Sequence, residues 1–290
     1  MNHDSRVDTL SSRAYLDENG EVIAEMVWFE QPSVDPLNST WIEHAMFFGP
    51  DADFNLDQLR VAGQTYDVII STQYFAEKLV ISWIEPEGTW TDPSNIQHRV
   101  LDAVVDERYF HSQLVDLNAD GKRDLLVSVN SYDNGKLVAY EIPDDFRFGK
   151  WTRHDLAHGF KPKGKSKNSG SPGACRAFYP MEPGSLVFDG RMKPLIMLSG
   201  DDDGNVYLFE NNADADPAVW SYTFKSFFSS NGTVGSPAIN DIDGDGYMDV
   251  FVPASTDGQI HTYTFKPSVV DRTFSDVVVA KGDNFQGGKF

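Results

Sequence analysis

Residues 116–140 read DLNADGKRDLLVSVNSYDNGKLVAY, and this stretch holds the pattern that decides the fold. An acidic loop leads into an apolar run at Asp124, a polar turn occupies residues 133–135, and a second apolar run begins at Leu137. The Asp, Asn and Gly residues of the turn tolerate the positive φ angles of tight hairpins. The stretch therefore predicts a loop, a buried strand, a turn and a second strand.

The same strand–turn–strand unit recurs along the chain. Its copies begin at Asp67, Asp124, Pro194 and Asp249, and a weaker copy opens the chain with strands at 7–12 and 22–29. Further strands are expected before the hairpins, at 110–117 and 234–240, and after them, at 41–44, 96–100, 151–154, 220–224 and 276–279. Helical periodicity is nearly absent, which indicates an all-β chain.

Four-stranded units that repeat about every 58 residues are typical of β-propeller blades, because each small sheet must bury both faces against its neighbours. We therefore predict that residues 1–290 form a single-domain, all-β propeller of about five four-stranded blades. The first copy lacks its innermost strand. Residues 281–290 follow the last outer strand and are expected to supply it, which closes the ring. The alternative is that the chain is a fragment of a longer propeller.

Two copies share an acidic loop that suits a metal ion. The predicted ligand residues are Asp116, Asn118, Asp120, Lys122 and Asp124 in one loop, and Asp241, Asp243, Asp245, Tyr247 and Asp249 in the other. Side-chain oxygens fall at positions 1, 3, 5 and 9, position 7 offers its backbone carbonyl, and a glycine at position 6 lets the chain fold back. Calcium takes about six to eight oxygen ligands in flexible geometry.

We therefore predict two structural Ca²⁺ sites, with Mg²⁺ as the other candidate ion. The competing interpretation is a plain acidic turn whose carboxylates cap backbone amides. The loop around Asp189 and Gly190 keeps only the centre of the pattern, and residues 57–67 lack the ligand spacing. Two sites, and not five, are expected.

The metal loops, the buried strands and the W-x-x-H motifs at Trp41–His44 and Trp151–His154 resemble the FG-GAP/VCBS repeat family of β-propellers, which includes integrin α-subunit heads. The sequence pattern of residues 28–44 is also similar to that of fungal aldos-2-ulose dehydratases, which are propeller-based lyases. The resemblance implies structural calcium at the blade loops. It does not fix a function, because propellers serve adhesion, scaffolding and catalysis.

The innermost strands of a propeller line its channel, and three residues there are candidates for catalysis. His111 precedes the first metal loop, and Arg176 and Tyr179 lie on the expected inner strand of the next blade. An imidazole can move a proton near neutral pH, and a guanidinium beside it can hold a carboxylate or enolate oxygen. We expect the three to converge at one channel mouth. The alternative for His111 is a hydrogen-bonded inner-strand residue without a catalytic role.

Two functions are consistent with these residues. One is an enzyme of the lyase, isomerase or cyclase type that binds a small molecule at the channel mouth. The other is a non-catalytic module that binds glycans or proteins. The chain contains no Ser-His-Asp arrangement, GxSxG elbow or HExxH motif. The loop at residues 161–167 is expected to be solvated, with a lid over the channel as the alternative.

The net charge and the composition limit the binding partners and the cellular compartments that are expected for the chain. The formal net charge of −20 disfavours nucleic acid and anionic membrane surfaces. No apolar run reaches the length of a membrane span or of a signal peptide. Cys175 is the only cysteine, which suits a reducing compartment. These features predict a cytoplasmic protein, or a secreted one if a signal was removed, and leave the oligomeric state open.

Overall fold

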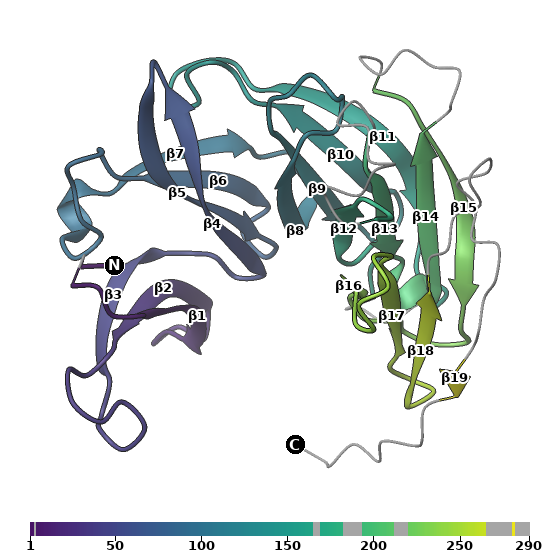
Figure 1. Cartoon of the computed structure of the whole chain (residues 1–290), viewed down its shortest axis with the longest axis horizontal. Coiled ribbons are helices and arrows are strands. Elements are labelled where there is room, and N and C mark those ends of the chain that lie inside the picture. The colour runs from purple at the N-terminus through teal and green to yellow at the C-terminus, as the bar shows by residue number, and fades with distance from the viewer. Residues whose placement is uncertain (3, 165–168, 182–192, 212–219, 265–279, 282–290) are drawn as a thin grey trace. The chain divides into compact units, whose positions relative to one another are not determined.

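The computed structural model describes residues 1–2, 4–164, 169–181, 193–211, 220–264 and 280–281 (Figure 1). These residues form five antiparallel sheets of three or four strands, two short 3-10 helices and no α-helix. The all-β prediction is therefore confirmed. The chain divides into two compact units, residues 1–112 with 143–151 and residues 113–142 with 152–290. The propeller arrangement and the single domain stay predictions.

The first unit contains two sheets in which each strand pairs with the next along the chain. One contains β1 (Thr9–Leu16), β2 (Val22–Glu30) and β3 (Ile42–Phe48), and the other contains β4 (Asp53–Val61), β5 (Gln64–Gln73), β6 (Lys78–Trp83) and β7 (Gln97–Asp102). The first sheet has three strands, in agreement with the strand expected to be missing from the first copy. A 3-10 helix at Pro93–Asn95 precedes β7.

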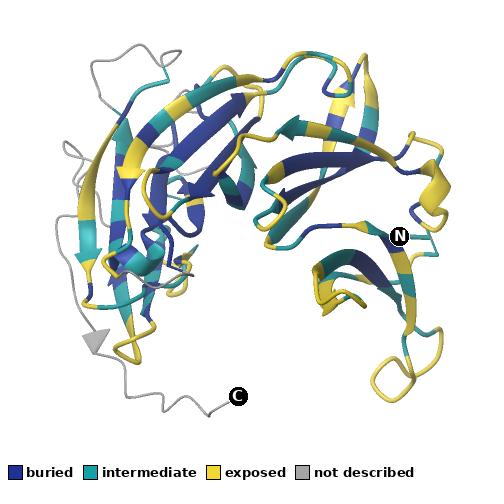
Figure 2. Cartoon of the chain, turned by 180° about the vertical axis from the view of Figure 1, so that it is seen from behind, coloured by how far each residue is buried: buried dark blue, intermediate teal, exposed yellow. Residues whose placement is uncertain are grey.

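Apolar side chains join the two sheets of the first unit. Met26 and Trp28 of β2 form one buried cluster with Ile69 of β5 and with Ile84, just after β6. Residues 68–72 of β5 are all buried, which explains why this strand reads as a continuous apolar run and not as an alternating one. By contrast, the last four residues of β1 and the first residue of β2 are exposed (Figure 2).

The second unit contains three sheets. One sheet contains β8 (Arg108–Val115), which begins in the first unit, β9 (Asp124–Asn130), β10 (Gly135–Glu141) and β11 (Thr152–Phe160). The next contains β12 (Cys175–Phe178), β13 (Leu195–Ser199), β14 (Asn205–Asn211) and β15 (Tyr222–Ser229). The last contains β16 (Ala238–Asn240), β17 (Asp249–Ala254), β18 (Gln259–Thr264) and β19 (Ala280–Lys281). A 3-10 helix at Asp201–Asp203 joins β13 to β14.

Most strands begin within about two residues of the predicted position, but several, such as β11 and β15, extend four to six residues beyond the predicted end. The strand expected at 110–117 is β8, two residues earlier, and the one expected at 234–240 is reduced to the three residues of β16. An isolated bridge between Val234 and Ala254 extends that pairing. The outer strand expected at 276–279 and the closing segment after Lys281 lie outside the described residues.

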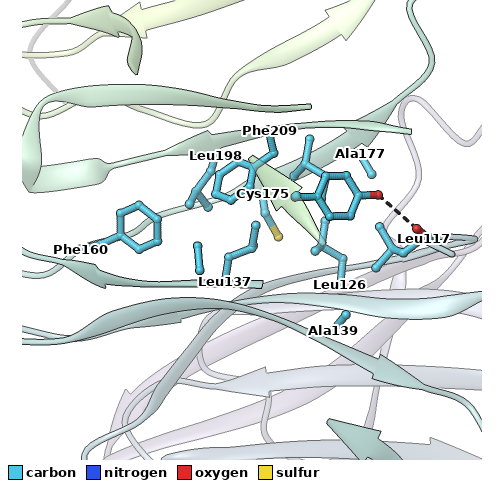
Figure 3. Packing of buried hydrophobic residues seen from close by; sticks show 12 residues of the cluster. Leu117, Leu126, Leu137, Ala139, Phe160, Cys175, Ala177, Leu198 and Phe209 are labelled. Carbon is cyan, nitrogen blue, oxygen red and sulfur yellow. Dashed lines mark hydrogen bonds between the residues drawn. The ribbon is translucent and has the colours of Figure 1, made fainter. Parts of the chain in front are cut away.

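Alternate residues of β13 join the three sheets of the second unit face to face. Ile196 and Leu198 belong to a buried cluster with residues of β9, β10 and β12, part of which Figure 3 shows. Leu195 and Met197 point to the other face and pack with Val250 and other residues of the last sheet. Burial of each such side chain stabilises the fold by roughly 1.5–3 kcal/mol. This packing fixes where the connections between strands lie.

Candidate metal centres and the predicted catalytic residues

The first acidic loop connects β8 to β9 and is organised by its own carboxylates. Asp116 accepts the N–H of Gly121 at 2.8 Å, and Asp120 accepts the N–H of Lys122 at 2.7 Å. Asn118 Oδ1 accepts the N–H of Asp120 at 3.1 Å. The chain reverses through the glycine at position 6, which has a φ of 85°.

The second acidic loop connects β16 to β17 and repeats these hydrogen bonds position by position. Asp241 accepts the N–H of Gly246 at 2.8 Å, Asp243 accepts that of Asp245 at 3.1 Å, and Asp245 accepts that of Tyr247 at 3.0 Å. Its position-6 glycine has a φ of 86°. The two loops therefore share one conformation, as their sequences predict.

The ninth residue closes each loop from the first position of a buried strand. Asp124 Oδ2 accepts the N–H of Leu117 at 2.9 Å, and Asp249 Oδ2 accepts that of Ile242 at 3.1 Å. Both aspartates are buried. Burial, together with the negative charges of Asp120 and Asp116, raises the pKa of Asp124 to about 7. The loops thus bring negative charge into places where water screens it poorly.

The second loop fits a calcium ion. One carboxylate oxygen each from Asp241, Asp243 and Asp249 lie within 4.8 Å of one another. Calcium–oxygen distances of about 2.3–2.6 Å place opposite ligands of one ion up to about 5 Å apart, so the three oxygens can share an ion. The amide caps expected of a plain acidic turn are present at the same three aspartates.

The first loop has the same backbone with a different side-chain arrangement. Asn118 donates its Nδ2 to Asp120 Oδ2 at 3.0 Å, so these two predicted ligands bond to each other. Position 3 is an amide here and a carboxylate in the second loop, which makes the first loop the less charged of the two. Its oxygen donors still suit a hard cation.

Two residues beside the first loop were not predicted from the sequence. Tyr222 of β15 donates its hydroxyl to the Leu117 carbonyl at 3.2 Å, which is the dashed line in Figure 3. The Lys193 ammonium lies 5.3 Å from the centre of the Tyr222 ring and is buried. Neither residue is near the loop in sequence, and no motif marks them.

The three predicted catalytic residues lie in different surroundings. His111 is buried in the first unit, with its Nε2 3.8 Å from Asp53 Oδ2. Arg176 is exposed on β12 in the second unit, and Tyr179 follows the end of that strand. Burial and the negative charge of Asp116 raise the pKa of Tyr179, so its phenol stays protonated at neutral pH. The convergence of the three residues stays a prediction.

Asp53 is a functional candidate that the sequence did not single out. It lies at the start of β4 and also accepts the N–H of Ser112 at 3.3 Å. The 3.8 Å separation from His111 Nε2 is within ion-pair range and longer than a hydrogen bond, so Asp53 can favour the protonated imidazole through its charge. The sequence gives no signal for this pair, since the two residues belong to different strands far apart in the chain.

Three histidines on the last strands of their sheets, His44, His98 and His154, make ring and hydrogen-bond contacts. His44 stacks on Trp28 with ring centres 4.1 Å apart, and His154 stacks on Trp220 at 4.2 Å. His98 Nδ1 lies 2.9 Å from Ser82 Oγ, and burial lowers the pKa of this imidazole.

Part of the lysine-rich loop expected to be solvated is held against the second unit. Lys161 Nζ forms an ion pair with Asp133 at 2.9 Å, and Lys163 Nζ donates to the Ser230 carbonyl at 2.7 Å. Residues 165–168 lie outside the described part of the chain, as does the degenerate loop at Asp189 and Gly190.

No family model matches the chain, and no curated protein matches it. The described residues contain no helix with the length and apolar character needed to cross a membrane.

Proposed function

We propose that the protein is a calcium-stabilised β-propeller of the FG-GAP/VCBS type, in which each acidic loop holds one Ca²⁺ ion. The observation that carries this proposal is the matched hydrogen bonding of the loops at residues 116–124 and 241–249. Convergent evidence comes from the oxygens of Asp241, Asp243 and Asp249. The chain's own residues would orient the ligands and hold the strand that follows each loop, and the ion would neutralise their charge.

Thermal unfolding with and without a chelator tests the calcium proposal. An ion that binds only the folded state at 100 times its Kd adds about 2.7 kcal/mol per site, so EDTA should lower the Tm and Ca²⁺ should restore it. Asp245→Asn should reduce the calcium-dependent gain, whereas Glu87→Gln, at an exposed carboxylate outside the loops, should not. An unchanged Tm in EDTA, with no metal by elemental analysis, contradicts the proposal.

We propose as a second candidate function that the protein is an enzyme of lyase, isomerase or cyclase type acting on a small molecule, with His111 as the proton-transfer group. The pairing of His111 with Asp53 supports this role. Arg176 would bind an anionic substrate oxygen, and the Tyr179 phenol would donate a hydrogen bond. The alternative is a module that binds glycans or proteins without catalysis.

A ligand screen on the calcium-loaded protein separates these functions. Sugars, hydroxy-aldehydes and small carboxylates are tested for thermal stabilisation and for chemical conversion. His111→Gln and Arg176→Ala should each weaken binding or turnover at least about tenfold, which corresponds to about 1.4 kcal/mol. His111 is buried, so glutamine is preferred to alanine because it leaves a smaller cavity. Undiminished binding and no conversion in either variant contradict the catalytic role.

A further inference from the structure

We infer that the segment Ala177–Met181 couples the two acidic loops, so that calcium binding at one loop strengthens calcium binding at the other. The segment is the end of β12 and the three residues after it. This inference rests on the proposed calcium binding and concerns the regulation of those same sites. It follows from hydrogen bonds that join the segment to β8, just before the first loop, and to the second loop itself.

On one side the segment is bonded to the entrance of the first loop. Gln113, three residues before Asp116, accepts the N–H of Ala177 at 2.7 Å and donates its Nε2 to the Ala177 carbonyl at 3.0 Å. A side-chain amide thus takes the place of a paired strand and satisfies both backbone groups of one residue. Tyr179, two residues further on, lies within the electrostatic influence of Asp116. Movement of the loop entrance is therefore transmitted to the segment.

On the other side the segment is bonded to positions 7 and 8 of the second loop. Met248 donates its N–H to the Pro180 carbonyl at 3.1 Å, and Met181 forms an isolated antiparallel bridge with Tyr247. Tyr247 occupies position 7, whose backbone carbonyl is a predicted calcium ligand. The orientation of that carbonyl therefore depends on where the segment lies.

The segment is short and three of its five residues are buried, which limits its freedom to move on its own. Ala177 and Phe178 belong to the buried clusters on the two faces of the β12–β15 sheet, and Pro180 is buried. Packed interiors respond to a shift by moving as a unit, because they contain little free volume. An ion that fixes one loop then fixes the segment, and the second loop binds its ion with less ordering left to do. The effect must be reciprocal.

Calcium titration of the full chain by calorimetry tests the coupling. The wild-type protein should bind two ions with positive cooperativity. Asp243→Asn, which weakens the second loop, should lower the affinity of the first loop about fivefold or more, within the usual range of coupling between sites. Gln113→Leu keeps all ten ligand positions and removes both bonds to Ala177, so it should abolish the cooperativity while two ions still bind. Gln58→Leu, which removes an amide bond to Asp67 within the β4–β5 pair, is the control and should leave cooperativity unchanged.

The outcomes separate the coupling from the calcium sites themselves. Two independent sites in the wild-type protein, with first-loop affinity unchanged by Asp243→Asn, overturn the coupling and leave the calcium proposal standing. Cooperativity that persists in Gln113→Leu overturns the route through the segment. Absence of calcium binding in the folded wild-type protein overturns the proposed function and the coupling with it. If Asp243→Asn fails to fold, the comparison of the wild-type protein with Gln113→Leu decides alone.

Discussion

Asp201 shows how a single carboxylate can limit stability at neutral pH. It lies in the connection between β13 and β14 with a φ of 55°, a conformation that Asp and Asn tolerate better than most residues. Burial, together with the charges of Asp202 and Asp203, raises its pKa to about 7. The folded state therefore favours the protonated form, and ionisation of Asp201 destabilises the protein as the pH rises from about 4 to above 7.

Replacing Asp201 with asparagine should remove this penalty. Asp201→Asn is expected to stabilise the protein at pH 8 by about 1–2 kcal/mol, because solvent screens part of the penalty at this partly buried site. The gain should shrink toward zero near pH 4, where the wild-type carboxyl is protonated. Thermal unfolding of both proteins at pH 4.5 and pH 8 measures the difference. A gain of equal size at both pH values contradicts the assignment.

Tyr222 provides a second test at the residue scale. Its hydroxyl satisfies the carbonyl of Leu117, the second residue of the first acidic loop, in a buried setting. Tyr222→Phe leaves that carbonyl unsatisfied and should cost about 1–3 kcal/mol. Chemical denaturation measures the cost, and Tyr263→Phe, at a buried tyrosine of β18, is the matched control. Equal effects of the two substitutions would show that the Leu117 bond contributes nothing specific.

At the scale of the element, two sheets of the second unit share a serine–aspartate hydrogen bond that joins the hairpin turn to the start of the sheet. Ser171 Oγ donates to Asp203 Oδ2 at 3.1 Å, and Ser230 Oγ donates to Asp257 Oδ2 at 2.8 Å. Each serine precedes the first strand of its sheet, and each aspartate lies in the turn between the second and third strands. This hydrogen bond connects parts of a sheet that are not adjacent in sequence.

Loss of one such serine should loosen one hairpin. Ser171→Ala leaves the buried Asp203 with one fewer donor, although Tyr207 still donates to it at 2.8 Å. We expect a loss of about 1–2 kcal/mol and faster hydrogen exchange in β13 and β14. Exchange in β17 and β18, whose hairpin has its own serine, should not change. Uniform acceleration in both sheets would contradict a local role.

The sequence predicted elements well and contacts poorly, and the elements themselves explain the difference. Hairpin turns such as Asp203–Gly204 and the two acidic loops carry their information in consecutive residues, where local backbone chemistry decides the conformation. The bonds from Gln113 to Ala177 and from Tyr222 to Leu117 depend on how sheets stack. Period-two alternation gives the face on which a side chain lies and not the partner that it meets.

The same limit applies to the catalytic candidates. The position of His111 on an inner strand is readable from the repeat, but its partner Asp53 comes from the preceding sheet and carries no motif. Tyr179 was predicted as a channel residue, and in the structure the negative charge of Asp116 in the first acidic loop helps to raise its pKa. Both interactions are tertiary, so single-sequence reasoning had no means to find them.

At the scale of the whole molecule, the three-stranded first sheet leaves β1 as an edge strand. Exposed strand edges promote unwanted pairing, and natural proteins usually cover them. If residues 281–290 supply the missing strand, their deletion should lower the Tm by several degrees and increase aggregation, as light scattering would show. A truncated chain with the Tm and solubility of the full chain would contradict this role of the segment.

Calcium stoichiometry shows whether the two acidic loops each hold a calcium ion. Equilibrium dialysis of the folded, chelator-treated protein against radioactive calcium should give two ions per chain. At a calcium concentration that saturates the wild-type protein, Asp120→Asn or Asp245→Asn should each leave about one ion bound, and the double variant none. Zero bound calcium in the wild-type protein, or two ions still bound tightly in the double variant, would contradict the account.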